Sequence, residues 1–266
     1  MSSEVVPLHH PSPNPTPLRV VVLGSSQAVL VRPRRTGGGG TYAECLVAEL
    51  AERGLEADVA NEGRWFEMTD HMFRRWDEAV APRMPQVVVL HVGFVECQPW
   101  VVPHALHRWV LAWKTSLHPA ARAGRRAVAA PLQRAMQWWT PHWTRLVRQH
   151  LWKQSPRRFR AELERLIGQT RAELGAQVLV LSMAPRADDW LVELMPDLPE
   201  RMARYDAILA DVVRSRNDPG VVLVDLGAVH ADLEDAAAPD GIHLSPAAHR
   251  QVASLLADEI VTGLAS

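Results

Sequence analysis

Five short apolar runs separated by amphipathic segments dominate the hydrophobic pattern of this chain. Three of the runs consist almost entirely of Val and Leu, which is typical of parallel strands that are covered on both faces. The segments between the runs repeat apolar residues at the spacing of one helical face, which indicates helices. The predicted strands are Arg19–Gly24, Ala57–Ala60, Gln86–Val92, Gln177–Ser182 and Val221–Leu226.

Strands that alternate with helices favour an open parallel sheet with helices on both of its faces. The expected fold class is therefore α/β, with three layers and a five-stranded parallel sheet in the middle. Ligands of such sheets bind beyond the carboxyl ends of the strands. The predicted helices are Thr41–Arg53, Glu67–Val80, one that begins at Pro156, Pro199–Arg216 and Pro246–Val261.

The composition fits one large α/β domain. The chain has 266 residues, 47% of them hydrophobic, and a net charge of -1, so it can bury a core without disulfides. Cys45 and Cys97 have no CxxC spacing and are expected to be buried thiols in a reducing compartment. No apolar run reaches transmembrane length. We therefore expect a cytoplasmic protein, and the excess of Arg over Lys indicates a GC-rich bacterial genome.

Two segments depart from the alternating pattern. Residues 1–18 hold five prolines and no apolar signal-peptide segment, so we expect a disordered lead-in before a folded domain over 19–266. Residues 97–160 contain no Asp or Glu, but twelve Arg and Lys and seven of the ten Trp. We expect this segment to be a basic, Trp-rich helical insertion between the third and fourth strands. Its basic residues can form a solvated face, dock on the acidic body, or meet an anionic ligand, carrier protein or membrane.

Candidate chemistry lies near the two ends of the domain. Ser26 follows the first predicted strand, and His243 follows Asp240 by three residues. A carboxylate at that spacing can hold the Nδ1–H of the imidazole, which leaves Nε2 as a base toward a serine hydroxyl. Taken singly, Ser26 is better explained as a helix cap or turn residue, Asp240 fits a turn, and His243 fits a structural histidine near a helix start. Their joint occurrence at one predicted sheet edge favours an activated serine nucleophile.

These motifs and their order resemble those of the SGNH (GDSL-type) serine esterase/acyl hydrolase family. The resemblance implies a flavodoxin-like α/β/α fold, with Ser26 as nucleophile, His243 as base and Asp240 as orienting acid. The first block is Gly24-Ser25-Ser26, the second is Asn61-Glu62-Gly63 and the third is Gly93-Phe94-Val95-Glu96. In the second block, the resemblance implies that the backbone N–H of Gly63 binds the oxyanion. The implied oxyanion and binding residues are Gly63, Asn61, Gly93 and Glu96.

The third block departs from the family pattern at Val95. The family has an asparagine there that helps to bind the oxyanion, and valine cannot donate a hydrogen bond. Loss of one such donor costs about 10²–10³ in turnover. Three explanations stay open: a substitute donor (Asn61, an insertion side chain or a shifted backbone N–H), an activated substrate such as a thioester, or binding without turnover. Glu96, which replaces an aspartate, is expected to order its loop rather than to pair with an arginine.

The predicted function is a serine-dependent hydrolase or acyltransferase acting on a carboxylic ester, thioester or acetyl group. The alternative is a catalytically weakened domain of the same type that binds an anionic ligand or carrier partner through residues 97–160. No cofactor is expected, and the histidines lack metal-ligand spacing. The expected partner is a small ester or acyl substrate, with anionic and carrier-linked substrates as candidates, and not a nucleic acid. The sequence predicts neither the natural substrate nor the oligomeric state.

Overall fold

One parallel sheet of five strands, in the order β2-β1-β3-β4-β5, forms the centre of the molecule. The structure is a computed structural model that describes residues 16–29, 40–98, 153–183, 192–193, 195–233, 236 and 243–265. All strand pairs are parallel, which confirms the predicted α/β class and the five-stranded sheet. The strands are β1 (Leu18–Gly24), β2 (Ala57–Asn61), β3 (Val87–His91), β4 (Gln177–Leu181) and β5 (Val221–Val224).

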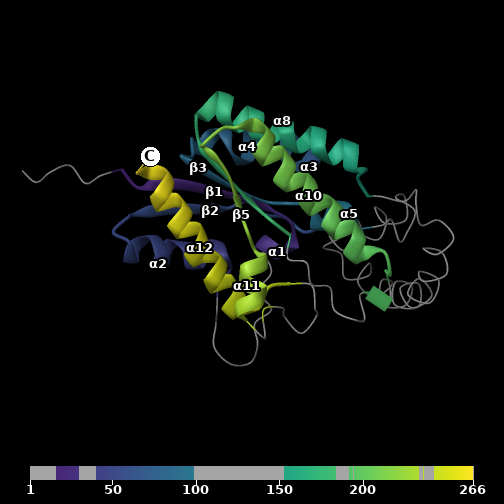
Figure 1. Cartoon of the computed structure of the whole chain (residues 1–266). Coiled ribbons are helices and arrows are strands. Elements are labelled where there is room, and N and C mark those ends of the chain that lie inside the picture. The colour runs from purple at the N-terminus through teal and green to yellow at the C-terminus, as the bar shows by residue number, and fades with distance from the viewer. Residues whose placement is uncertain are drawn as a thin grey trace, which may run out of the picture.

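Helices cover both faces of the sheet, as Figure 1 shows. One face is covered by α2 (Tyr42–Glu52), α11 (Gly227–Asp232) and α12 (Pro246–Leu264). The other face is covered by α3 (Thr69–Arg74), α4 (Trp76–Ala79), α8 (Pro156–Leu174) and α10 (Leu198–Arg216). The short elements are α1 (Ser26–Val29), the 3₁₀ helix η1 (Ala81–Arg83) and α5 (Phe94–Cys97).

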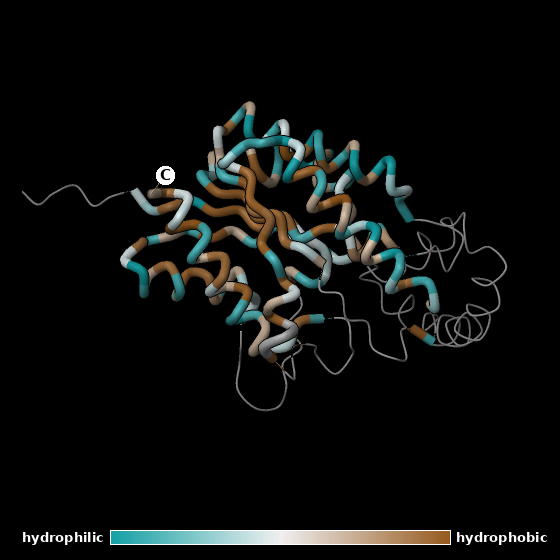
Figure 2. Tube along the Cα trace, viewed as in Figure 1, coloured by the Kyte–Doolittle hydropathy of each residue, from teal (hydrophilic) through white to brown (hydrophobic). Residues whose placement is uncertain are grey.

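Alternate strand residues supply two separate hydrophobic cores. In β1, Val20 and Val22 pack under α2 and α12, whereas Val21 and Leu23 pack under the helices of the opposite face. Figure 2 shows the strands as the most continuously hydrophobic part of the chain. The uninterrupted Val and Leu runs therefore reflect burial on both faces.

Hydroxyl side chains begin three of the predicted helices. The Ser155 and Ser245 hydroxyls accept hydrogen bonds from backbone N–H groups at the start of α8 and α12. Thr41 and Glu44 form a reciprocal capping box at the start of α2. These Ser-Pro and Thr-x-x-Glu signals confirm the predicted starts. α12 begins three residues after His243, so the Ser245 cap also holds the segment that carries this imidazole.

The predicted helix Glu67–Val80 is wrong as a single element, because the structure divides it into α3 and α4. The break falls at Arg75, whose backbone torsions are φ -98° and ψ 8°. Glu67 precedes the first of the two helices instead of belonging to it. Its carboxylate binds the Arg75 guanidinium at 2.6 Å, so a buried ion pair joins the segment before α3 to the residue at the break.

The predicted insertion over 97–160 leaves and rejoins the domain at one place. The backbone N–H of Lys153 donates to the carbonyl of Gln98 at 3.1 Å, and the Lys153 Nζ donates to the Gln98 Oε1 at 2.5 Å. Arg157, Arg158 and Arg160, which the prediction counted in this segment, belong to α8. Residues 99–152 of the insertion and residues 1–15 of the predicted lead-in lie outside the described residues. In the described part of the chain, no helix has the length and apolarity needed to cross a membrane.

Candidate active site

Ser26 and His243 meet at the carboxyl edge of the sheet. Ser26 is the first residue of α1, two residues after the end of β1, and His243 lies three residues before α12. The Ser26 Oγ and the His243 Nε2 are 3.0 Å apart, which is hydrogen-bond distance. Both side chains are buried, at 6% and 8% exposure. The fold therefore joins two residues that are 217 positions apart in the chain, as the sequence predicted.

The segment around His243 is fixed on its C-terminal side. The backbone N–H of Ser245 donates to the carbonyl of Ala236 at 2.8 Å. The Ser245 hydroxyl caps α12, and Leu244 is buried in the core below that helix. Asp240, the predicted third member of the group, lies outside the described residues. Its role therefore stays a prediction.

A second buried imidazole, His91, ends β3 next to the last residue of β1. Its Nδ1 lies 3.2 Å from the hydroxyl of Tyr42. The pKa of His91 is lowered to about 3, mainly by burial and to a smaller extent by the charge of the nearby His249. His91 is therefore neutral at physiological pH and engaged with Tyr42. Of the two imidazoles, only His243 is placed to act as a base toward Ser26.

Gly24 lets α1 pack directly on the sheet. A Cβ at this position would lie 2.7 Å from the Cβ of Ala28 and 3.1 Å from the Cβ of His91. Real Cβ atoms do not approach each other so closely, so only glycine permits this spacing of β1 and α1. Because Ser26 opens α1, Gly24 also sets the position of the serine hydroxyl.

The loop after β2 lies against the same short helix. A Cβ at Gly63 would lie 2.8 Å from the Cγ1 of Val29 and 3.0 Å from the Cβ of Ala28. The Asn61 Nδ2 donates to the carbonyl of Ala28 at 2.8 Å, and its Oδ1 accepts the backbone N–H of Gly63 at 3.1 Å. The predicted residues Asn61 and Gly63 are therefore beside the helix of Ser26. In this structure the Gly63 N–H is engaged by Asn61.

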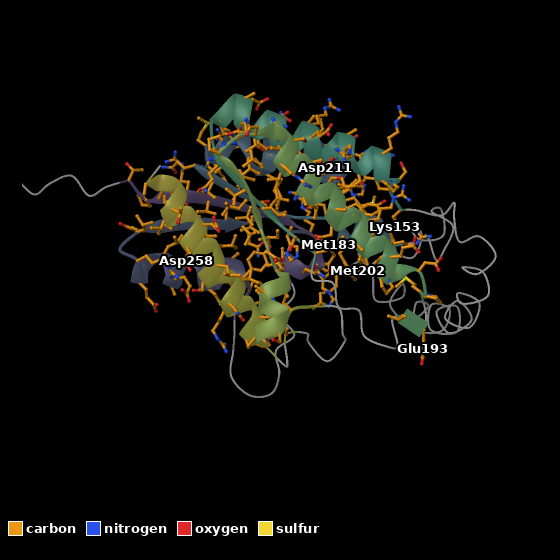
Figure 3. All side chains as sticks on the ribbon, in the orientation of Figure 1. Lys153, Met183, Glu193, Met202, Asp211 and Asp258 are labelled. Atoms are coloured by element: carbon orange, nitrogen blue, oxygen red, sulfur yellow. The ribbon has the colours of Figure 1, made fainter. Side chains whose placement is uncertain are left out.

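The residues of the third block are used mainly to build their own loop. The Glu96 carboxylate accepts the backbone N–H groups of Thr69 at 2.8 Å and Gly93 at 3.0 Å. Burial raises the pKa of Glu96 to about 7, and these hydrogen bonds act in the opposite direction. Gly93 has a φ of 107° and lies against Met183, which Figure 3 labels. Val95 is buried at 3% exposure and brings no donor to the site.

Two aromatic residues that the sequence analysis did not single out lie next to His243. The rings of Trp65 and His243 are 6.1 Å apart in an edge-on arrangement. The rings of Trp65 and Phe66 are 6.2 Å apart. Both are exposed, at 55% and 36%. The only sequence signal was two successive aromatic residues just after the Asn-x-Gly motif.

A buried ionic cluster holds the loop that carries these aromatic residues. The Arg75 Nε and Nη2 donate to the two carboxylate oxygens of Glu67 at 2.6 and 2.9 Å. Nη2 also donates to the backbone carbonyl of Glu62 at 2.7 Å, and Arg83 binds the Glu62 carboxylate at 2.5 Å. Arg75 therefore fastens both ends of the segment from Glu62 to Glu67. Sequence periodicity misses this contact because it depends on tertiary structure.

The described residues contain no group of three His, Cys, Asp or Glu that could hold a metal ion. The chemistry that these residues do offer is nucleophilic. Ser26 supplies a hydroxyl, His243 supplies a base within hydrogen-bond distance, and backbone N–H groups lie around the first turn of α1. This combination is suited to attack on a carbonyl carbon.

Comparisons with known proteins agree with this architecture. No protein-family model matches the sequence, and no curated protein matches it. The structure is similar to a lipase/acylhydrolase from Enterococcus faecalis, with a TM-score of 0.60 and 16% identity over 91% of this chain and 95% of that chain. It is similar to TesA, with a TM-score of 0.57 and 16% identity over 92% of this chain and 99% of that chain.

An acetylxylan esterase from Geobacillus stearothermophilus, Axe2, is also similar in structure. The TM-score is 0.58 and the identity is 17%, over 91% of this chain and 94% of that chain. These similarities extend over most of each protein, and the five-stranded parallel sheet with the order β2-β1-β3-β4-β5 agrees with the flavodoxin-like fold that the resemblance implied. The chain therefore has the SGNH hydrolase fold.

Proposed function

We propose that this protein is a serine-dependent hydrolase or acyltransferase that acts on a carboxylic ester, a thioester or an acetyl group. The observation that carries the proposal is the 3.0 Å distance between the Ser26 Oγ and the His243 Nε2. The titles of the similar structures, a lipase/acylhydrolase and an acetylxylan esterase, support ester chemistry as the reaction class.

In the proposed mechanism, the Ser26 Oγ attacks the carbonyl carbon while the His243 Nε2 takes the hydroxyl proton. The bond to the leaving group then breaks, and His243 returns the proton to the departing oxygen or sulfur. Water or an acceptor hydroxyl attacks the acyl-enzyme in the same way, with His243 again as base, and releases Ser26. Asp240 is the proposed partner of the His243 Nδ1–H, because it precedes the histidine by three residues.

The proposed oxyanion donors are the backbone N–H groups of Ser26 and Gly63. Ser26 is the first residue of α1. The first N–H groups of a helix have no hydrogen-bond partner within that helix, so the Ser26 N–H is a candidate donor. The N–H of Gly63 now donates to the Asn61 Oδ1, so it must exchange that oxygen for the oxyanion of the intermediate. Such an exchange makes the second donor available in the transition state.

A weakly catalytic binding domain is the second candidate. The observation that favours it is the small number of oxyanion donors: Val95 replaces an amide, and Asn61 engages Gly63. Each missing donor lowers turnover by about 10²–10³. If Ser26 reacts, this candidate differs from the first only in a slower turnover. If Ser26 does not react, the protein binds its ligand without turnover.

A fluorophosphonate probe tests whether Ser26 is activated. We expect the probe to label the wild-type protein at one site and to leave Ser26→Ala unlabelled. His243→Ala should label far more slowly, because the hydroxyl loses its base. Intact-protein and peptide mass spectrometry measure the site and the rate. Absence of labelling in the wild type, or equal labelling of Ser26→Ala, would remove the proposal.

Gly24→Ala tests whether the packing of α1 on β1 sets the activity. The added Cβ must displace Ala28 and with it the helix that carries Ser26. Because misplacement by about 1 Å costs about 100-fold in rate, we expect a loss of this order in ester turnover. Overpacking should also lower the free energy of unfolding by about 1–3 kcal/mol.

Gly168→Ala is the matched control for this change. Gly168 lies inside α8, and the nearest atom to an added Cβ, in Arg216, is 3.7 Å away. We expect unchanged turnover and a gain of up to about 1 kcal/mol in stability, because alanine is the better helix former. Unaltered turnover in Gly24→Ala would contradict the account of α1.

A further inference from the structure

Trp65 and Phe66 form an exposed surface directly beside a buried reactive pair. We call these two residues the aromatic ledge. Trp65 is 55% exposed and Phe66 is 36% exposed, whereas Ser26 and His243 are below 10%. Single exposed hydrophobic side chains are common, but two adjacent aromatic rings next to a candidate base mark a binding surface.

The ledge continues from the imidazole of His243 to the ammonium of Lys153. The Trp65 ring is 6.1 Å from the His243 ring, and the Phe66 ring is 6.2 Å from the Trp65 ring. The Nζ of Lys153 lies 5.6 Å from the centre of the Phe66 ring. Figure 3 labels Lys153, which lies three residues before the start of α8. A molecule that lies along the ledge therefore has one end at His243.

Contacts outside the two rings also hold the loop of the ledge in place. Arg75 binds Glu67 on one side of the ledge and the carbonyl of Glu62 on the other. The Arg64 N–H donates to the carbonyl of Gly24 at 2.9 Å, which ties the loop to β1. Phe66 has a φ of 55°, a conformation that bulky residues rarely adopt. The loop thus presents both rings to solvent from a rigid base, as a preformed binding surface requires.

The chemistry of the proposed reaction indicates which part of an ester meets the ledge. His243 must return its proton to the leaving oxygen, so the alcohol portion of the ester departs from beside the imidazole. Trp65 contacts that imidazole and is therefore on the alcohol side of the scissile bond. We infer that Trp65 and Phe66 bind the alcohol portion of the substrate, and that this portion has a flat apolar face. This inference rests on the proposed ester chemistry at Ser26.

Two kinds of alcohol offer a flat apolar face: an aryl alcohol and the C–H face of a sugar ring. Three acetates with a common acyl group test the inference: phenyl acetate, an acetylated methyl glucoside and ethyl acetate. We expect Trp65→Ala to lower kcat/KM by about three- to tenfold for phenyl acetate, for the glucoside, or for both. Ethyl acetate, which has no flat face, should change less than twofold. Whichever ring acetate shows the loss identifies the alcohol.

Three controls separate binding from other effects. Trp65→Tyr keeps a ring and should restore most of the lost kcat/KM. Leu264→Ala removes a side chain with similar exposure, 52%, at the far end of α12, about 27 Å along that helix from its start, and should change nothing. A series of phenyl esters with lengthening acyl chains should show the same relative loss in Trp65→Ala at every chain length.

Binding without turnover gives an independent test. In a Ser26→Ala background, saturation-transfer NMR should show ring acetates bound more strongly than ethyl acetate, and Trp65→Ala should abolish the difference. This measurement tests the ledge even if Ser26 proves unreactive. An equal loss of kcat/KM for all three acetates, or a loss that grows with acyl length, would overturn the inference. Unchanged ring-acetate binding in Ser26→Ala/Trp65→Ala would also overturn it.

Discussion

Ser26→Ala is expected to lower kcat for a simple ester such as p-nitrophenyl acetate by about 10⁴- to 10⁶-fold. The reason is that the substitution removes the hydroxyl held 3.0 Å from the His243 Nε2. The fold should survive, because the substitution removes one hydrogen bond, worth about 0.5–1.5 kcal/mol. Initial rates and thermal unfolding of the purified variant measure the two effects separately.

Ser182→Ala is a matched control for this substitution. Ser182 is also buried at the carboxyl edge of the sheet, where it follows β4. Its hydroxyl donates to Asp225 at 3.1 Å and accepts the backbone N–H of Leu226 at 2.8 Å, so its role is structural. We expect a loss of stability with turnover nearly unchanged. Equal losses of turnover in the two variants would show that any serine-to-alanine change at this edge of the sheet lowers turnover, and that Ser26 has no special role.

Arg75→Gln is expected to lower the free energy of unfolding by about 3–5 kcal/mol. The side chains of Arg75 and Glu67 are 10% and 3% exposed, so loss of the guanidinium leaves a buried carboxylate without its charge partner. The loop from Glu62 to Glu67 also loses its fastening, which should raise KM for ring acetates through the displaced Trp65. Chemical denaturation measures the first effect, and steady-state kinetics measures the second.

Arg53→Gln supplies the contrast for a surface arginine. Arg53 also binds two carboxylates, at 2.7 Å to Glu49 and 2.8 Å to Asp258, but the partners are 25% and 63% exposed. Solvent screening limits its loss to about 1 kcal/mol or less. Replacing the buried pair together, as Arg75→Met with Glu67→Leu, should recover much of the lost stability. A loss in Arg75→Gln no larger than that in Arg53→Gln would contradict the description of a buried ionic cluster.

The sheet and the meeting of Ser26 with His243 were predictable because both follow from local patterns. Uninterrupted Val and Leu runs mark strands with two covered faces, and all parallel strands present their carboxyl ends at one edge. Ser26 lies two residues after the end of β1, and His243 lies two residues before the Ser-Pro start of α12. Two residues placed by such signals fall together even though they are distant in the chain.

Features set by tertiary contacts were not predictable. The Glu67–Val80 helix is divided at Arg75, and no spacing rule reveals that the Arg75 guanidinium binds the Glu67 carboxylate and the Glu62 carbonyl. The aromatic ledge has no periodic sequence pattern. It stands out only through the contact of Trp65 with His243, which depends on the tertiary structure. The engagement of the Gly63 N–H by Asn61 likewise depends on loop geometry. Asp240 and most of residues 97–160 lie outside the described residues, so their predicted roles stay predictions.

The central claim is that Ser26 becomes acylated during turnover. Rapid-quench mass spectrometry of the wild-type protein mixed with p-nitrophenyl acetate tests this claim most directly. We predict an acetyl group on Ser26 within the first turnover, its disappearance as substrate is consumed, and its absence in His243→Ala on the same time scale. Turnover of the ester with no acetyl group on Ser26, or with the acetyl group on another residue, would contradict the account.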